Sequence, residues 1–316
     1  MIRTVLLTEP MHEDGLALLR ARPNVRLLVA PPDLRGALAE AAAIGVRVLK
    51  LDAGLLARAP RLEVVAKHGV GYDNVDIAYL AGRGIPMTIT ADANAVSVAE
   101  HTMMLMLAAA KHLAFYDAAV RHGRWAERQS MRAVDLAERT ALVVGHGRVG
   151  RRVAALCHAF GMRVLVHDIL PMPPSDAYTL APGLDAALAE ADVVTLHIPL
   201  SPGAARLFDA ARIARMKPGA VLVNCARGGL VDEAALAAAL RTGALAAAAT
   251  DVFEEEPPPP GHDLLGLPNL VLTPHSAATT LEGARRMSVG VARNILDAFD
   301  GRLDPAMVVN GVPAPR

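Results

Sequence analysis

The chain has 316 residues, of which 53% are hydrophobic, 20% charged and only 3% aromatic. Lysine plus arginine equals aspartate plus glutamate at 32 each, so net charge gives no reason to expect nucleic acid or an anionic membrane as a partner. So few aromatic residues also argue against stacking platforms for single strands. At about 100–200 residues per domain, this length predicts two domains.

Two cysteines, Cys157 and Cys225, are too few for a disulfide framework or a metal cage, and we expect no metal site. The opening stretch "MIRTVLLTEP" becomes polar too soon for a signal peptide. The longest apolar run, 102–110, is far shorter than the roughly 18 residues of a membrane span. We therefore expect a cytoplasmic protein that binds neither membrane nor nucleic acid.

Short β-branched runs alternate with Ala- and Leu-rich helical patterns along the chain. They predict strands at 4–7, 25–29, 46–49, 62–66 and 87–90, and, after a long helical stretch, at 141–144, 163–167, 193–197, 220–224, 247–252 and 270–272. Alternation of this kind is typical of parallel sheets covered by helices on both faces. The predicted fold class is α/β, with two doubly wound parallel-sheet domains.

The long helical stretch predicts one helix over 97–121, in which Ser97 and Glu100 have the spacing of a capping box. A second long helix is predicted over 281–299. Because a long helix can bridge two lobes, we place a nucleotide domain at 99–282. The substrate domain is then discontinuous and combines 1–98 with 283–316.

Gly145, Gly147 and Gly150 form a G-x-G-x-x-G pattern directly after a predicted strand and at the start of an amphipathic helix. In that context the pattern predicts a dinucleotide site, with the pyrophosphate at the helix N-terminus. Asp168 ends the next strand, where a carboxylate can accept the two ribose hydroxyls. Residues 169–175 contain no Arg or Lys to hold a 2′-phosphate. We therefore expect NAD as cofactor rather than NADP.

Three ionisable side chains follow strand ends in the same half of the chain: Arg227, Glu256 and His275. Ligands of open α/β sheets bind at the carboxyl ends of the strands. Hydride transfer to a carbonyl needs a proton donor such as histidine, a carboxylate to orient the imidazole, and a guanidinium to hold a substrate carboxylate. The three residues match these roles and predict the catalytic group of a 2-oxo acid reductase.

The sequence resembles the D-isomer-specific 2-hydroxyacid dehydrogenases, the family of phosphoglycerate dehydrogenase and hydroxypyruvate reductase. The matching stretches are "KHGVGYDNVD" (67–76), "NAVSVAEH" (94–101), "GHGRVGRRVA" (145–154), "MKPGAVLVNCARGGLVDEAAL" (216–236), "DVFEEEP" (251–257) and "TPHSAATT" (273–280). The resemblance implies a Rossmann nucleotide domain inserted in a flavodoxin-like substrate domain, and a homodimer. It also implies a small 2-oxo or 2-hydroxy acid as substrate.

The resemblance further implies which residues form the site. It selects Glu256 over Glu254 and Glu255 as the partner of His275, and it has the N–H groups of Val70 and Gly71 contact the substrate. It adds cofactor contacts beyond the three glycines, from Arg148, Val149, Asp168, Ile198, Pro199, Cys225, Ala226, Arg227, Asp251 and His275. Asp251 has an alternative role, in which its carboxylate only satisfies turn amides.

Arg47 and Lys67 follow or end strands of the substrate half, and either could face the substrate. They would favour a substrate with a second anionic group such as a phosphate. The alternative is that both are surface cations. We expect a substrate of the 3-phosphoglycerate/phosphohydroxypyruvate or of the hydroxypyruvate/glyoxylate type. His146 replaces the apolar residue usual inside the glycine loop, which predicts a mild pH dependence of cofactor affinity.

Two other functions stay open at this point. Some relatives are NADH-sensing co-regulators that bind protein partners, and retained Arg227, Glu256 and His275 do not exclude that role. A formate dehydrogenase is the second alternative. Glu256 argues against it, because that branch pairs its histidine with an uncharged glutamine.

Overall fold

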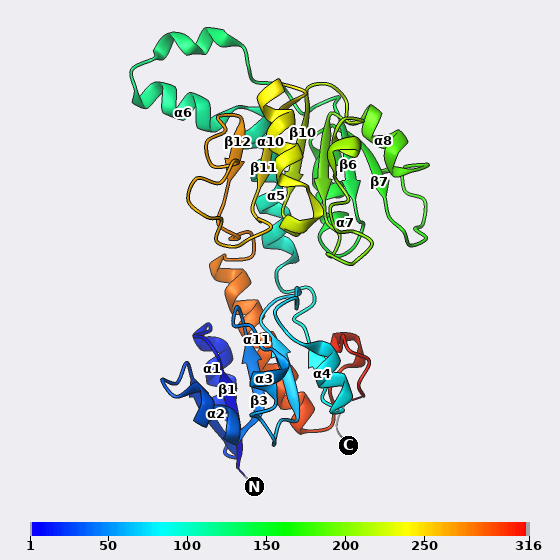
Figure 1. Ribbon diagram of the computed structural model, residues 1–316. Coiled ribbons are helices and arrows are strands. Elements are labelled where there is room, and N and C mark those ends of the chain that lie inside the picture. Colours follow the sequence, from blue (N-terminus) through cyan, green and yellow to red (C-terminus); the bar gives the residue numbers. More distant parts are fainter. Residues whose placement is uncertain (1, 314–316) are drawn as a thin grey trace. The chain divides into compact units, whose positions relative to one another are not determined.

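The computed structural model of the protein describes residues 2–313. Contacts divide the chain into two compact units (Figure 1). Unit 2 is Ala95–Ala277, and unit 1 combines the chain up to Asn94 with the chain from Ala278 onward. Unit 2 is thus inserted between two segments of unit 1, and both divisions lie a few residues before the expected boundaries at 98/99 and 282/283.

Unit 1 contains a five-stranded parallel sheet in the order β2-β1-β3-β4-β5. Its strands are β1 (Arg3–Leu7), β2 (Val25–Val29), β3 (Ala41–Val46), β4 (Val64–Lys67) and β5 (Met87–Thr88). The predicted strand at 46–49 is wrong: the strand is the preceding Ala-rich stretch, whose pattern is helical. All six residues of β3 are buried, so small side chains fit between the two helical layers and override the weak β propensity of alanine.

Helices cover both faces of this sheet. They are α1 (Glu13–Arg20), α2 (Leu34–Glu40), α3 (Ala53–Leu56), α4 (Ile77–Gly82) and α11 (Leu281–Phe299), with a short 3-10 helix η3 (Pro305–Met307) near the end. One buried cluster joins β1 to α1 and α11 through residues such as Leu16 and Ile295. The other joins the sheet to α2, α3 and α4 through Leu38, Leu56 and Leu80. The extent predicted for α11 is confirmed.

Unit 2 contains a seven-stranded parallel sheet in the order β12-β11-β10-β9-β6-β7-β8. Its strands are β6 (Thr140–Val144), β7 (Arg163–His167), β8 (Thr179–Leu180), β9 (Val193–Leu196), β10 (Ala220–Asn224), β11 (Leu245–Thr250) and β12 (Leu270–Leu272). The strand order reverses between β6 and β9, which is where open α/β sheets bind ligands. The two parallel sheets confirm the predicted fold class. The edge strand β8 escaped prediction because it is two exposed residues long.

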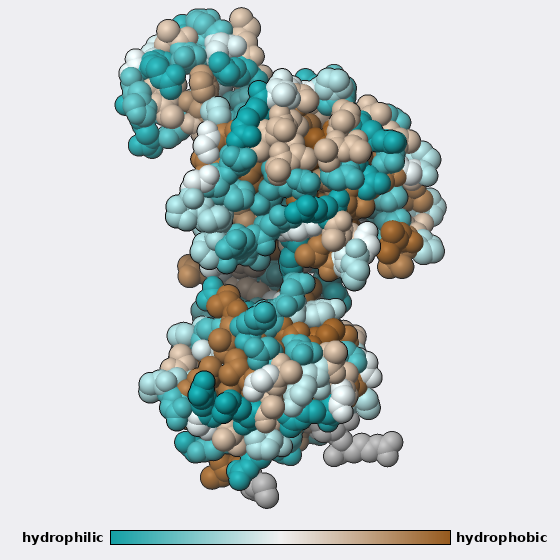
Figure 2. All heavy atoms as spheres, viewed as in Figure 1, coloured by the Kyte–Doolittle hydropathy of each residue, from teal (hydrophilic) through white to brown (hydrophobic). Residues whose placement is uncertain are grey.

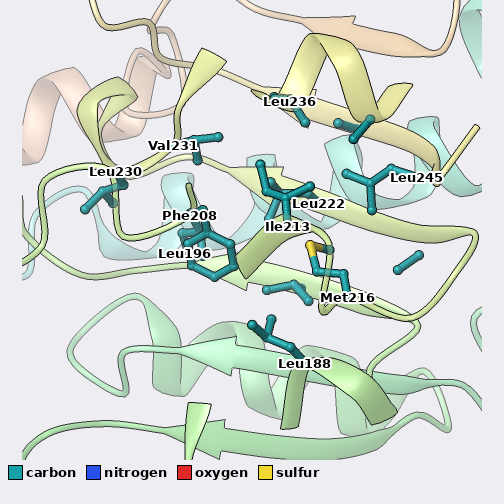
Figure 3. Close-up of a cluster of buried hydrophobic side chains, with 14 of the residues drawn as sticks. Leu188, Leu196, Phe208, Ile213, Met216, Leu222, Leu230, Val231, Leu236 and Leu245 are labelled. Carbon is teal, nitrogen blue, oxygen red and sulfur yellow. The ribbon is translucent and has the colours of Figure 1, made fainter. Parts of the chain in front are cut away.

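The helices of unit 2 are α5 (Ala95–Ala110), α6 (Leu113–Arg121), α7 (Gly150–Ala159), α8 (Leu184–Glu190), α9 (Ala210–Ile213) and α10 (Glu233–Thr242), with 3-10 helices η1 (Trp125–Ser130) and η2 (Gly228–Leu230). Figure 3 shows Leu196 and Leu222 of the sheet packing with Phe208 and Leu236 in a buried cluster. On the visible surface of both units, hydrophilic and apolar side chains are mixed (Figure 2).

The predicted continuous helix over 97–121 is wrong. It breaks at His112, whose backbone is left-handed (φ 49°), and α5 and α6 meet at a bend of 62°. The helix also begins at Ala95, so Ser97 lies buried inside it rather than capping it. Among residues 2–313, no single helix has both the length and the hydropathy of a membrane span; only the bent α5–α6 pair reaches them jointly, by length and composition alone.

Candidate active site

The glycine loop connects β6 to α7, and two of its glycines are required by close packing. A Cβ on Gly145 would lie 2.6 Å from the carbonyl oxygen of His197, and one on Gly150 would lie 1.9 Å from the carbonyl oxygen of Gly145. A Cβ on Gly147 would meet nothing within 4 Å. Gly147 therefore faces open space. Because glycine has no side chain, another group can approach its backbone there. This arrangement fits a dinucleotide pyrophosphate.

The other loop residues of the predicted cofactor site surround these glycines. Val149 is the N-cap of α7 and makes no side-chain capping bond, and Arg148 before it is exposed. Ile198, which Pro199 follows at the end of β9, lies against Gly145, with its Cγ2 2.7 Å from the position of a Cβ there. The structure thus brings the β6 and β9 ends together at the reversal point of the sheet.

Asp168 has two bonds that the sequence did not indicate. Its Oδ2 accepts the N–H of His146 at 2.7 Å and its Oδ1 accepts the N–H of Leu170 at 2.9 Å. The carboxylate therefore fastens the glycine loop to the end of β7. Because an ionised carboxylate offers about four lone-pair sites, acceptor capacity remains for ribose hydroxyls.

His146 packs its ring against Tyr178, with the ring centroids 4.7 Å apart. Burial lowers the pKa of His146 below its usual value, although the charge of Asp168 opposes this. The imidazole is thus held beside the glycine loop mainly in its neutral form near pH 7.

Arg227 stands in a turn that Asn224 clamps from both sides. The buried Asn224 side chain accepts the N–H of Ala226 at 3.0 Å and donates to the carbonyl oxygen of Arg227 at 2.9 Å. The guanidinium Nη1 donates to the Ala226 oxygen at 2.7 Å. Asn224 was missed as a site residue; its position two residues before Ala226, typical of an Asx turn, could have identified it.

Gly228 explains why glycine follows Arg227. A Cβ there would lie 1.9 Å from the carbonyl carbon of Phe253, so the two backbones touch. Gly229 is less constrained, because its Cβ would meet only the tip of the Leu200 side chain at 3.1 Å. The turn after β10 therefore packs directly against the segment after β11.

Glu256 joins that segment to His275. Its Oε2 lies 2.6 Å from Nδ1 of His275, and its Oε1 accepts the N–H of Phe253 at 3.0 Å. Burial alone would raise the pKa of Glu256, but the bonds from His275 and Phe253 and the nearby charges of His275 and Arg227 lower it below its usual value. The structure thus brings the three predicted catalytic side chains into one electrostatic group at the carboxyl edge of the sheet.

His275 has a left-handed backbone (φ 49°) and donates its N–H to the carbonyl oxygen of Asp251 at 2.7 Å. The Asp251 side chain is 1% exposed, and its carboxylate accepts from the hydroxyl of Thr273 and the N–H groups of Ser276 and Ala277. These contacts match the alternative role, in which Asp251 satisfies the turn that carries His275.

Cys225 lies between β10 and the Arg227 turn and is 9% exposed. Burial raises the pKa of its thiol to about 12, and burial does the same for Cys157. Any contact of Cys225 with a cofactor therefore involves an uncharged thiol or its backbone. Among the residues that the structure describes, no three His, Cys, Asp or Glu side chains form a group that could hold a metal ion.

The predicted substrate residues belong to unit 1. Val70 and Gly71 lie in the loop after β4, which is fastened by three hydrogen bonds between Gly69 and Thr90. The expectation that Lys67 is either a substrate cation or a surface cation needs correction. Lys67 is 7% exposed, and its ammonium donates to the carbonyl oxygen of Arg47 and to Oδ1 of Asn74.

Lys67 therefore braces two loops. Asn74 completes the brace by donating to the carbonyl oxygen of Leu49 at 2.7 Å. Arg47 itself is exposed, and its N–H bonds to Oε2 of Glu9 at 2.9 Å. Of the two predicted substrate cations, only Arg47 has an exposed side chain.

Known proteins resemble this chain over nearly all of its length. The D-3-phosphoglycerate dehydrogenase of Archaeoglobus fulgidus is 37% identical over 303 residues, covering 94% of this chain and 57% of that protein. The glyoxylate reductase of Aeropyrum pernix is 37% identical over 267 residues, covering 82% and 80%. The structure of a D-lactate dehydrogenase from Aquifex aeolicus, complexed with NAD and lactic acid, matches with a TM-score of 0.87 at 29% identity, covering 98% and 99%.

The chain spans 57–58% of the length of the phosphoglycerate dehydrogenases that it matches. A family model described as "D-isomer specific 2-hydroxyacid dehydrogenase, NAD binding domain" matches residues 103–277, more than half of the chain and almost all of unit 2. The glycine loop, the reversal of the sheet order and the position of Asp168 are those expected of a dinucleotide-binding domain. The chain belongs to the D-isomer specific 2-hydroxyacid dehydrogenase family, and its second unit contains the family's NAD-binding domain.

Proposed function

We propose that this protein is an NAD-dependent D-2-hydroxyacid dehydrogenase that interconverts a small 2-oxo acid and the matching 2-hydroxy acid. One observation carries the proposal: the 2.6 Å contact between His275 Nδ1 and Glu256 Oε2, within the electrostatic influence of Arg227. An imidazole held by a carboxylate beside a guanidinium is the set of groups that a carbonyl reduction requires. Its position on the carboxyl edge of an NAD-binding sheet supports the same conclusion.

Bound NADH would supply the hydride, and the protein must then supply a proton. Because Glu256 holds Nδ1 of His275, Nε2 is the nitrogen that gives a proton to the substrate oxygen during reduction and takes it back during oxidation. The Glu256 carboxylate stabilises the protonated imidazole and fixes its orientation. The Phe253 N–H restrains the carboxylate in turn.

Arg227 would hold the substrate carboxylate with two parallel hydrogen bonds and polarise the adjacent carbonyl. The clamp from Asn224 fixes the backbone on which the guanidinium stands. The family resemblance assigns further substrate contacts to the N–H groups of Val70 and Gly71 in the loop after β4. Together these groups orient a 2-oxo acid without using its side chain.

Within this class we favour substrates of the size of hydroxypyruvate or glyoxylate. The name of the Aeropyrum pernix relative supports this choice. Phosphohydroxypyruvate stays a candidate as well. Arg47 is the predicted cation that would bind its phosphate, because the Lys67 ammonium already donates to the Arg47 carbonyl oxygen and to Asn74. An Arg47→Ala variant should lose activity selectively with the phosphorylated acid if that acid is the substrate.

The test is a panel of 2-oxo acids with NADH, run on the wild type and on His275→Ala. Steady NADH oxidation with a small hydroxylated acid, lost by a factor of at least about 100 in the variant, supports the proposal. Best turnover with branched aliphatic acids contradicts the substrate choice, and a preference for NADPH contradicts the role of Asp168. NADH-dependent capture of a protein partner without turnover indicates a sensor instead.

We also propose a homodimer formed through the arm, which is the segment 113–131 containing α6 and η1. Figure 1 shows the arm extending from the body of unit 2. Leu113, Val120, Trp125 and Met131 on it are 59%, 57%, 66% and 85% exposed. Several exposed apolar side chains on one projecting segment favour burial against another protein surface. We choose a second copy of this chain as the partner, because two-fold homodimers are the commonest oligomers.

A further inference from the structure

The turn that carries His275 is fastened to helix α5 through a chain of side chains. His101 of α5 has Nε2 3.0 Å from Oγ1 of Thr273, which follows β12. Thr273 Oγ1 lies 2.6 Å from Oδ1 of Asp251, which follows β11. The Asp251 carboxylate then accepts the N–H groups of Ser276 and Ala277, both at 2.9 Å. This series of hydrogen bonds thus ends at the two residues that follow His275.

Counting protons assigns the direction of each bond. A carboxylate that is 1% exposed and accepts two backbone N–H groups is an acceptor only. Thr273 has a single hydroxyl hydrogen and must give it to Asp251. Its oxygen therefore accepts from His101, so Nε2 of His101 carries a hydrogen. The same nitrogen lies 3.4 Å from Asp251 Oδ1, so the N–H of His101 also lies close to the buried carboxylate.

The turn needs this restraint because His275 has a left-handed backbone, with φ at 49°. For a residue with a Cβ this conformation costs on the order of 1 kcal/mol and persists only where the surroundings enforce it. Relaxation to negative φ would redirect the imidazole away from Glu256. The bonds to Asp251 hold the backbone, and His101 fixes the hydroxyl of Thr273 that completes the carboxylate's set of donors.

We infer that His101 is a positioning residue: through Thr273 and Asp251 it holds the 273–277 turn in the conformation that aims His275 at the substrate. The inference rests on the proposed function of His275. A positioning role differs from a packing role for His101 because it requires that His101 donate a hydrogen bond to Thr273. A side chain of equal bulk without an N–H at this position leaves the Thr273 oxygen without its donor.

The experiment compares His101→Leu, His101→Gln and Thr273→Val, with His158→Leu as the matched control. His158 is an exposed histidine of α7. His101→Leu should lower kcat about tenfold, which is the loss of one buried hydrogen bond, while KM and the Kd of NADH stay within twofold. Glutamine, whose Nε2 can donate in the same place, should restore most of the activity, and Thr273→Val should match His101→Leu.

The double variant His101→Leu/Thr273→Val should lose about as much kcat as either single variant, because both changes break the same series of hydrogen bonds. Full additivity, a tenfold change in NADH Kd instead of kcat, or a His101→Gln variant as poor as His101→Leu would overturn the inference. Unchanged kcat per folded molecule in His101→Leu, with only the melting temperature lowered, would also overturn it.

A second readout does not need turnover. The imidazole NMR signals of His275, assigned by their loss in His275→Ala, should shift in His101→Leu and stay in place in His158→Leu. Unshifted signals overturn the positioning role. If the wild type reduces no 2-oxo acid, the proposed function fails, and these signals still decide whether His101 holds the turn.

Discussion

Glu256 uses each of its two carboxylate oxygens for one neighbour: one lies against His275 and the other accepts the N–H of Phe253. Burial opposes its charge, yet these bonds and the nearby charges hold its pKa below the usual value. The carboxylate therefore stays ionised throughout the neutral range. A charged partner favours the protonated imidazole that reduction consumes.

Glu256→Gln tests this charge while keeping the size and one oxygen of the side chain. We expect kcat/KM for reduction to fall about 100-fold and its pH profile to move to lower pH, because the imidazolium loses the carboxylate that stabilises it. The measurement is kcat/KM between pH 5.5 and 9. Glu254→Gln, whose carboxylate pairs with Arg206 at the surface, should reproduce the wild-type profile; a Glu256→Gln profile that superimposes on it contradicts the role.

Burial keeps His68 and His197 neutral at pH 7. Burial lowers the pKa of His68 to about 4, helped by the charges of Arg47 and Lys67, and lowers that of His197 to about 3. An unfolded histidine titrates near 6.5, so below that pH the unfolded chain binds more protons than the folded one. The contribution of these two neutral histidines to the free energy of unfolding is therefore complete above pH 6.5 and is lost as the pH falls toward 4.

We therefore expect the free energy of unfolding, measured in urea, to be level between pH 7 and 8 and to fall between pH 6.5 and 4. Each histidine can contribute at most about 1.4 kcal/mol per pH unit to this fall. His197→Gln, which keeps a hydrogen-bonding group for the Thr195 hydroxyl that lies 2.9 Å from Nε2 of His197, should make the free energy of unfolding depend less steeply on pH. An unaltered slope in this variant and in His68→Gln would show that other groups cause the acid sensitivity.

At the scale of elements, strands end where functional turns begin. β10 ends at Asn224 and the Arg227 turn follows; β11 ends at Thr250 and Asp251 follows; β12 ends at Leu272 and the His275 turn follows. Because parallel strands end at the same edge, three turns separated along the chain meet there. Gly228 permits the closest of these contacts, against the Phe253 backbone.

Gly228→Ala and Gly229→Ala form a matched pair that tests this contact. The Cβ of the first would overlap the Phe253 backbone, which must move together with the N–H that holds Glu256. We expect its free energy of unfolding to fall by about 2–3 kcal/mol and its kcat to fall more than tenfold. Gly229→Ala displaces only the Leu200 tip and should stay near wild type in both the urea midpoint and kcat; equal behaviour of the two variants contradicts the contact.

Element boundaries show what local pattern reading misses. The stretch 41–46 is a strand although alanines dominate it, because it lies between two helical layers and all its residues are buried. The helix predicted over 97–121 bends at His112, although no Pro or Gly marks the break. In 41–46, burial in the fold outweighs the propensity of a short window.

At the scale of the whole molecule, the proposed dimer has a built-in reporter. Trp125 is the single tryptophan of the chain and is 66% exposed on the arm. Burial against a second copy should shift its emission to shorter wavelength at high protein concentration, and dilution should reverse the shift. Sedimentation should show a dimer that Leu113→Asp dissociates.

Ile2→Asp is the control, because Ile2 is a 70% exposed apolar residue of unit 1 and its replacement should leave the dimer intact. A Trp125 emission independent of concentration, together with a monomer in sedimentation, contradicts the interface. Monomers formed by both variants would place the interface elsewhere.

The sequence by itself determined the α/β class, ten of the strand positions to within a few residues, the glycine loop and the candidate group Arg227, Glu256 and His275. These features are local or follow a topological rule: hydrophobic period marks strands, glycine spacing marks a phosphate turn, and parallel strands share one functional edge.

The tertiary structure decided what each buried polar group bonds to. It committed Lys67 to Asn74, placed Asp251 under the His275 turn, and tied Asp168 to the glycine loop. A buried charge must find its partners among whatever groups the fold brings within about 3 Å. Those groups come from distant parts of the chain, so the partners of a buried side chain follow from the fold and not from the residues beside it in sequence.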